Sequence, residues 1–152
     1  KPLAPPNAGP YTLCTMAQKG HRLGEGSRVG VVGGGPTGVQ LIAEIRDFVI
    51  RSILKNYPVS LSQVRFLLIQ DEDHLLEGMD PRLARYALKT LTQKRIEVLL
   101  GSRVTRLLPE GVEIDHDRVV TPTGTLIWTV GIRASPVVED LPPEKDDRGR
   151  IG

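Results

Sequence analysis

A glycine-rich stretch constrains the fold of this chain more than any other feature: residues 28–45 read RVGVVGGGPTGVQLIAEI. Before the glycines, Val29, Val31 and Val32 form a short apolar run, which is typical of a strand buried on both faces. After the glycines, apolar residues recur at helical spacing with charged residues between them. These apolar residues are Val39, Ile42, Ile45, Val49 and Ile53. The stretch therefore predicts a strand, a glycine turn and an amphipathic helix.

Three glycines of the turn match the pattern G-x-G-x-x-G, at Gly33, Gly35 and Gly38. Because the pattern follows a predicted strand and opens a predicted helix, its context is that of a dinucleotide-binding turn. Gly33 permits a tight turn, Gly35 lets the backbone approach a pyrophosphate, and Gly38 lets the helix pack closely. The N–H groups and the positive dipole end of the helix then favour the phosphates. A glycine turn that binds no ligand is the alternative.

Two helices and two further strands are predicted around this turn. Tyr57-Pro58 ends the first helix, because the residue before a proline is disfavoured in the α region. The second helix begins with Asp80 as its N-cap and Pro81 at its first position. The strands are expected at 64–69 and 98–100. The inward side chains of the second helix are predicted to be Leu83, Ala87, Leu88 and Leu91.

Beyond residue 101 the apolar segments become short and lose their helical spacing. Segments 104–107, 112–114 and 118–121 predict a three-stranded antiparallel meander, and 125–130 predicts one more apolar strand. Strands that alternate with helices imply an α/β fold with right-handed crossovers. We expect a Rossmann-like parallel sheet with helices, in which a three-stranded antiparallel β-meander replaces one helical crossover.

The two ends of the chain differ in composition from its middle. Residues 1–27 are rich in proline and glycine, with one short helix expected around Leu13–Leu23, and are interpreted as a linker or a remnant of a neighbouring domain. Residues 28–135 form the predicted folded domain. Residues 136–152 are interpreted as an exposed linker that leads back to the neighbouring domain.

The composition excludes several classes of function. A net charge of +2 over 152 residues is too small to indicate nucleic acid or an anionic membrane as a partner. Cys14 is the only cysteine, so an internal disulfide and a Cys-x-x-Cys redox pair are excluded, and a lone thiol fits a reducing, cytoplasmic location. His21, His74 and His116 are expected to be solvated, since none has a thiol or a carboxylate at ligand spacing. No metal site is predicted.

The residue after the second predicted strand bears on the choice of nucleotide. An acidic residue is expected there, because a carboxylate bonds the hydroxyls of the adenosine ribose. The chain has Gln70 at this position. An amide also bonds a hydroxyl, but it does not repel a 2′-phosphate, so a strict preference for NADH over NADPH is not indicated. The alternative is a polar residue at a strand end with no ligand.

Taken together, these motifs resemble the second dinucleotide-binding fold of the flavoproteins that bind two dinucleotides. They are most similar to type II NADH dehydrogenases, the single-subunit NADH:quinone oxidoreductases of the FAD-dependent pyridine nucleotide-disulfide oxidoreductase superfamily. The similarity lies in residues 31–45, in 80–88 followed by 96–98, and in the segment TGTLIWTVGIRASP at 123–136.

The resemblance implies a role for individual residues in binding NADH or NADPH. Gln70 would lie at the adenosine ribose and Gly131 near the nicotinamide. Gln40 stands where the family usually has a glutamate that touches the carboxamide; an amide can still bond a carboxamide but cannot relay a proton. Glu44, one turn later, would have either a minor role or a structural one. The pyrophosphate would be bound by Gly33, Gly34, Gly35, Pro36, Thr37 and Gly38.

The resemblance also implies the activity of the whole protein. The chain would position the nicotinamide for hydride transfer to FAD, which the remainder of the same flavoprotein would bind, with a quinone as the final acceptor. The chain alone is expected to be inactive and to self-associate through its uncovered surface, and the full-length protein is expected to be peripheral on the membrane. The alternatives are a domain of another flavoprotein reductase, of the ferredoxin or nitrite reductase type, and a non-enzymatic dinucleotide sensor.

Overall fold

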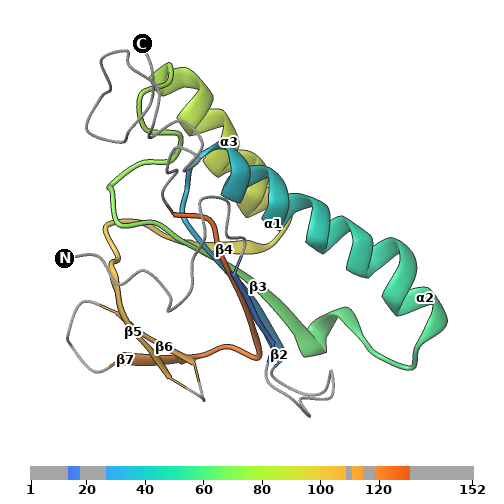
Figure 1. The fold of residues 1–152 in the computed structure, drawn as a ribbon. Helices are drawn as coiled ribbons and strands as arrows, with labels where there is room; N and C mark the ends of the chain where they lie inside the picture. The colour runs from blue at the N-terminus through green and yellow to red at the C-terminus, as the bar shows by residue number, and fades with distance from the viewer. Residues whose placement is uncertain (1–13, 18–26, 109–110, 115–118, 131–152) are drawn as a thin grey trace, which may run out of the picture.

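A five-stranded sheet forms the middle layer of the molecule, with the strand order β1-β8-β2-β3-β4 (Figure 1). The computed structural model describes residues 14–17, 27–108, 111–114 and 119–130. β8, β2, β3 and β4 run parallel, whereas β1 pairs antiparallel with β8. The strands of this sheet are β1 (Cys14–Ala17), β2 (Ser27–Val32), β3 (Val64–Ile69), β4 (Ile96–Leu99) and β8 (Thr125–Trp128). The predicted Rossmann-like parallel sheet is therefore confirmed.

The first strand corrects an expectation. A short helix was predicted around 13–23, but Cys14–Ala17 is a strand, with Cys14 opposite Trp128. An edge strand such as β8 presents a row of unpaired backbone groups, and pairing with it satisfies the backbone of a four-residue segment better than an isolated helical turn would. Residues 18–23 lie outside the described part of the chain.

Helices cover one face of this sheet. α1 (Pro36–Phe48) continues through a π-helical turn (Val49–Ile53) into α2 (Leu54–Asn56), and α3 (Pro81–Gln93) lies beside α1 (Figure 1). A 3₁₀ turn (Leu61–Gln63) leads into β3. In the described residues no helix is both long and apolar enough to cross a membrane. The side chains buried between helices and sheet include Ile42, Val49, Ala87, Leu91, Val31, Phe66 and Leu68.

The ends of both helices agree with the sequence, but one predicted inward residue does not. Tyr57 is extended and ends α2, and the Asp80 carboxylate accepts a hydrogen bond of 2.7 Å from the Arg82 N–H at the start of α3. Leu83, however, is 45% exposed, whereas Ala84 is buried. Leu83 and Ala84 both lie at helical spacing from Ala87 and Leu91, but they are about 100° apart around the helix, and the buried side of α3 runs through Ala84 rather than Leu83.

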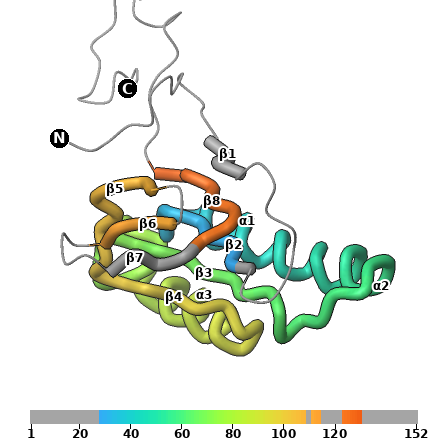
Figure 2. Tube along the Cα trace, turned by 90° about the horizontal axis from the view of Figure 1, so that it is seen from below, coloured from blue at the N-terminus to red at the C-terminus, as the bar shows by residue number. Residues whose placement is uncertain are grey.

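A small antiparallel sheet covers the opposite face, which confirms the predicted meander. Its strands are β5 (Val104–Leu108), β6 (Gly111–Ile114) and β7 (Val119–Pro122), in that order. Val112 and Ile114 pack against Leu67 and Ile69 of β3, with Trp128 partly buried beside them. Two views at right angles place this sheet and α2 on opposite sides of the molecule (Figure 1 and Figure 2).

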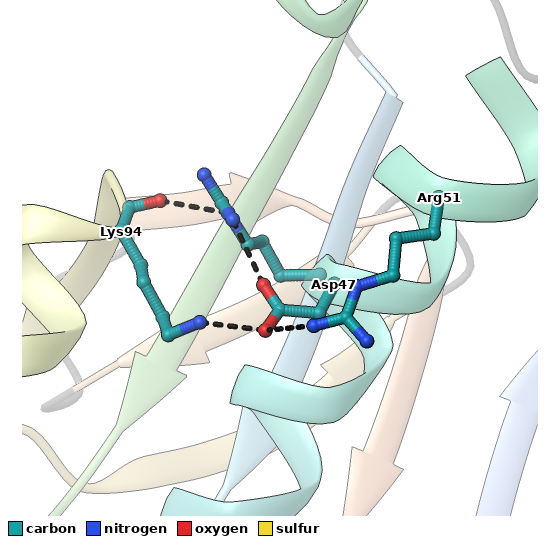
Figure 3. A network of polar contacts seen from close by, with 4 residues as sticks. Asp47, Arg51 and Lys94 are labelled. Carbon is teal, nitrogen blue, oxygen red and sulfur yellow. Dashed lines mark hydrogen bonds and ion pairs between the residues drawn. The ribbon is translucent and has the colours of Figure 1, made fainter. Parts of the chain in front are cut away.

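An ion-pair network ties α1 to the end of α3 (Figure 3). The Asp47 carboxylate accepts hydrogen bonds from Lys94 Nζ at 2.6 Å and from Arg46 Nη1 at 2.8 Å, and Arg51 lies 3.7 Å away. Arg46 Nε also donates to the Lys94 carbonyl at 3.1 Å, which caps the carboxyl end of α3. The bonds from Lys94 and Arg46 lower the pKa of Asp47 below its ordinary value. The charged form of Asp47 therefore stabilises the contact between the helices.

We expect Asp47→Asn to lower the free energy of unfolding by about 1 kcal/mol at neutral pH, since a half-buried, doubly bonded carboxylate is worth more than an exposed pair. Because the pKa of Asp47 is lower in the folded state, its contribution is complete above the unfolded pKa of about 4 and is lost as the pH falls through the folded value. Urea unfolding of both proteins across this pH range measures the difference, which should shrink in acid.

Asp71→Asn is the control, because the Asp71 carboxylate is 40% exposed and lies 3.8 Å from Arg103. This substitution should change the free energy of unfolding by less than about 0.5 kcal/mol. A difference between Asp47→Asn and the unsubstituted chain that stays constant with pH would contradict the role given to the Asp47 charge.

Candidate functional site

The glycine turn joins the carboxyl end of β2 to the first residue of α1. Gly33 has a φ of +110°, which L side chains rarely adopt, so the tight turn predicted there is confirmed. Its N–H donates to the Ile69 carbonyl at 2.8 Å. The turn is therefore bonded to the end of β3, the neighbouring strand, and starts from a fixed position at the carboxyl edge of the sheet.

Two other glycines of the motif differ in their surroundings. A Cβ placed on Gly38 would lie 1.8 Å from the Gly33 carbonyl oxygen, so a side chain there would force the helix away from the turn. The close packing predicted at Gly38 is confirmed, although its partner is the carbonyl of the turn itself. A Cβ placed on Gly35 meets no atom within 4 Å. Gly35 therefore borders open space, as the approach of a ligand to its backbone requires.

The first turn of α1 offers hydrogen-bond donors beside this open space. Gly35 is the N-cap, has no side chain to cap the helix, and is followed by Pro36, which has no N–H. Neither the Thr37 N–H nor the Gly38 N–H has an acceptor among the described residues. Two unused donors at the positive end of a 13-residue helix form an arrangement that fits a pyrophosphate.

Gln70 supports the glycine turn from the end of β3. Its side chain is buried, with 7% exposed, and its Oε1 accepts a hydrogen bond of 2.6 Å from the Gly34 N–H. The N–H donor fixes which end of the amide is the oxygen, so Nε2 points away from this bond. Nε2 has no acceptor among the described residues and remains available to donate to a ligand hydroxyl. The contact of Gln70 with an adenosine ribose stays a prediction. Its hydrogen bond to the glycine turn was not predicted from the sequence.

The loop after Gln70 bonds the other backbone polar group of Gly34, its carbonyl. The Leu76 N–H donates to the Gly34 carbonyl at 2.9 Å, so both backbone polar groups of Gly34 are bonded. A Cβ on Gly34 would lie 2.7 Å from Leu75 Cδ2. Leu76 has a φ of +56°, which is uncommon for leucine, and is kept there by burial and by this bond. A side chain at position 34 would therefore require the Leu75 and Gln70 side chains to shift.

Thr129 is a site residue that sequence reasoning missed. It directly follows β8, and both its N–H and its Oγ1 donate to the Val32 carbonyl at 2.8 Å. Its Oγ1 also lies 3.3 Å from the Gly33 carbonyl oxygen, and a Cβ on Gly33 would come within 2.7 Å of it. The available signal was a small hydroxyl residue at the end of a strand predicted to lie in the same parallel sheet as β2.

The other site residues predicted from the sequence are exposed on α1 or lie outside the described residues. Pro36, Thr37 and Gln40 are exposed on the first turns of α1. Glu44 is exposed too and makes no ion pair among the described residues, so its salt-bridged interpretation gains no support. Gly131 lies outside the described residues. The structure thus brings Gly33–Gly38 together with Gln70 and places Gln40 on the exposed side of the same helix.

The histidines take no part in the described site. His74 is exposed and its Nδ1 lies 2.5 Å from Asp73 Oδ1, a contact that raises the pKa of His74 and lowers that of Asp73. This agrees with the solvated state predicted for His74; His21 and His116 lie outside the described residues. Within residues 14–17, 27–108, 111–114 and 119–130, no group of side chains could hold a metal ion.

Comparison with known proteins identifies relatives of this chain. External alternative NAD(P)H-ubiquinone oxidoreductase B1, mitochondrial, of Arabidopsis thaliana is 35% identical over 124 residues, which are 79% of this chain and 22% of that protein. The internal enzyme A1 of the same plant is 36% identical over 122 residues, 80% of this chain and 23% of its own length. This chain therefore spans about a fifth of the length of these relatives.

A solved structure and a family profile complete the comparison. NDH2 from Plasmodium falciparum, solved in complex with NADH, superposes with a TM-score of 0.66 at 25% identity, over 74% of this chain and 24% of that one. The predicted similarity to type II NADH dehydrogenases is confirmed by these relatives. The profile described as pyridine nucleotide-disulphide oxidoreductase matches residues 6–152. The chain belongs to the pyridine nucleotide-disulphide oxidoreductase family.

Proposed function

We propose that this chain binds NADH or NADPH and positions the nicotinamide for hydride transfer to FAD in a type II NADH:quinone oxidoreductase. The observation that carries the proposal is the open space at Gly35 beside the unused N–H groups of Thr37 and Gly38. The family of the chain and the names of its relatives support the same function.

Each part of the dinucleotide has a proposed partner in the chain. The pyrophosphate lies over Gly35 and accepts from the helix N-terminus, and the adenosine ribose accepts from Gln70 Nε2. Gln40 and Gly131 are proposed contacts of the nicotinamide end. When bound, the nicotinamide supplies the hydride, and the chain's own residues bind and orient it.

The acceptors are proposed to lie in the remainder of the protein. FAD would be bound there and would pass electrons to a quinone, since the relatives are named ubiquinone oxidoreductases. Those relatives are also named mitochondrial. We therefore propose peripheral association with a membrane, where a quinone is dissolved, rather than a freely cytoplasmic location.

Gly35→Val tests the binding of the pyrophosphate. The valine side chain enters space that is empty in the structure, and Gly35 has an ordinary φ of −71°, so folding should be preserved. The same side chain blocks the approach of the phosphates, and we expect the dissociation constant for NADH to rise at least about tenfold, which is about 1.4 kcal/mol. Calorimetric titration and thermal unfolding measure the two effects.

Gly38→Ala is the matched variant for Gly35→Val, since its Cβ would meet the Gly33 carbonyl and should destabilise the fold itself. Normal NADH binding by a folded Gly35→Val protein would contradict the proposed position of the pyrophosphate.

Gln70→Glu tests the role of Gln70 in nucleotide selection. A glutamate oxygen can still accept from the Gly34 N–H, so the turn is retained, but its charge repels a 2′-phosphate. We expect NADPH binding to weaken by about tenfold relative to NADH binding. Gln70→Leu is the comparison, because it removes the support of the turn and should weaken both nucleotides alike. Equal losses in Gln70→Glu would show that residue 70 does not face the 2′ position.

The chain alone should not turn over NADH. It supplies position but no electron acceptor, so mixing it with NADH and a dye acceptor should leave the absorbance of NADH unchanged. The control is the same mixture with a known flavin-containing dehydrogenase, which should consume the NADH. Oxidation of NADH by the purified chain without an added flavin domain would contradict the proposed division of labour.

A further inference from the structure

Two loops meet at the carboxyl edge of the sheet beside Gln70. One loop follows β3 and the other follows β4, its parallel neighbour (Figure 1). The Gln70 N–H donates to the Leu99 carbonyl at 2.8 Å, and the Gln70 carbonyl accepts from the Ser102 N–H, also at 2.8 Å. Arg103 therefore follows a residue that is bonded to Gln70, whose own side chain supports the glycine turn.

The Arg103 side chain lies against the residue that follows Gln70. Its Nη2 is 3.8 Å from Asp71 Oδ2, and both side chains are exposed, Arg103 by 73% and Asp71 by 40%. Exposed ion pairs of this kind contribute little to stability. The Gly101 N–H donates to the Glu72 carbonyl at 2.7 Å, so a backbone bond also joins the two loops. The guanidinium can therefore leave Asp71 at small cost and without separating the loops.

The loop that carries Asp71 is strongly acidic. A phosphate monoester has about −1.5 to −2 charges at neutral pH and would be repelled by carboxylates beside it. Arg103 brings a positive charge to this edge, and its planar guanidinium can bond two phosphate oxygens at once. Arg103 therefore has the charge and the donor geometry that a phosphate beside Gln70 requires. The exposed carboxylates of the loop are Asp71, Glu72, Asp73, Glu77 and Asp80.

Gln70 by itself does not distinguish the two nucleotides. Its Oε1 accepts from the Gly34 N–H at 2.6 Å, and its Nε2 can donate to a hydroxyl or to a phosphate oxygen. Because an amide is neutral, it neither attracts nor repels the additional charge of NADPH. Asp71 and Arg103 are charged and lie next to it in opposite loops. The discrimination between a ribose hydroxyl and a 2′-phosphate therefore falls to these two side chains.

We propose that Arg103 determines whether the chain accepts NADPH. Its guanidinium leaves the Asp71 carboxylate for the 2′-phosphate of bound NADPH, and it stays on Asp71 when NADH is bound. This inference rests on the proposed function, since it takes the adenosine ribose to lie at Gln70, and it adds the residue that recognises the 2′ position. Asp71 competes with the phosphate for the same guanidinium and so limits the affinity for NADPH.

The test is calorimetric titration of the full chain with NADH and with NADPH, which differ only in the 2′-phosphate. Arg103→Gln should raise the dissociation constant for NADPH about fivefold, which is the upper end for an exposed ion pair, and should leave that for NADH within about twofold. Arg103→Lys keeps the charge but not the planar fork, so it should lose less affinity for NADPH than Arg103→Gln does.

Asp71→Asn separates direct binding of the phosphate from a mere screening of Asp71. This substitution frees Arg103 and removes a negative charge, so it should tighten NADPH binding and leave NADH binding unchanged. Adding Arg103→Gln to Asp71→Asn should again weaken NADPH binding about fivefold, because the guanidinium bonds the phosphate itself. If Arg103 acted only by neutralising Asp71, its loss in the Asp71→Asn background would have no effect.

Arg65→Gln is the matched control for net charge. Arg65 is exposed at the amino end of β3, about 16 Å along the strand from Gln70. Its substitution should leave the dissociation constants of both nucleotides unchanged, and circular dichroism should show that all variants are folded. Equal weakening of NADPH binding by Arg65→Gln and Arg103→Gln would show that only net charge matters and would overturn the proposal.

The result with NADH separates this inference from the proposed function. If the unsubstituted chain binds NADH and Arg103→Gln binds NADPH as the unsubstituted chain does, only the role of Arg103 is contradicted. Equal losses for NADH and NADPH in Arg103→Gln would also overturn it, since the residue would then not recognise the 2′ position. Failure of the unsubstituted chain to bind either nucleotide would contradict the proposed function and this inference together.

Discussion

The close approach of Gly38 to the Gly33 carbonyl is the constraint on which the rest of the site depends. A Cβ there would lie 1.8 Å from that oxygen, so the first turn of α1 can start directly at the end of β2 only with glycine. This start places the helix N-terminus at the carboxyl edge of the sheet, with its N–H groups beside the open space at Gly35. The conformation that presents donors to a ligand is therefore fixed by the steric requirement between Gly38 and Gly33.

The turn is held in this conformation by residues far away in the sequence. Gln70 and Leu76 bond the two polar groups of Gly34, and Thr129 bonds the carbonyls of Val32 and Gly33. These residues follow β3 and β8, the two neighbours of β2 in the sheet. A parallel sheet brings the carboxyl ends of neighbouring strands to one edge, so both neighbours can support the turn. The flexibility expected of three consecutive glycines is thereby restricted without any bulky side chain in the turn.

The sequence predicted those features whose causes are local. The buried strand at 64–69, the N-cap Asp80 and the tight turn at Gly33 each follow from a few adjacent residues, and the structure agrees with all three. Contacts between distant segments could not be predicted in the same way. The pairing of Cys14–Ala17 with β8, the rotation of α3 that exposes Leu83, and the inward Gln70 side chain all depend on where a neighbour lies in space. Tertiary context overrides local preference at these positions.

The net charge is a sum over the whole sequence, so it does not show where in space the charges lie. A value of +2 excludes little once the carboxylates and the cations occupy different surfaces. Asp71, Glu72, Asp73 and Glu77 are exposed in the loop after β3, next to the glycine turn, whereas five cations are exposed on or beside α2 and α3, namely Lys55, Arg82, Arg85, Lys89 and Arg95. The loop is bonded to the glycine turn through the Leu76 N–H, so the field at the nucleotide-binding edge depends on these carboxylates rather than on the average over the chain.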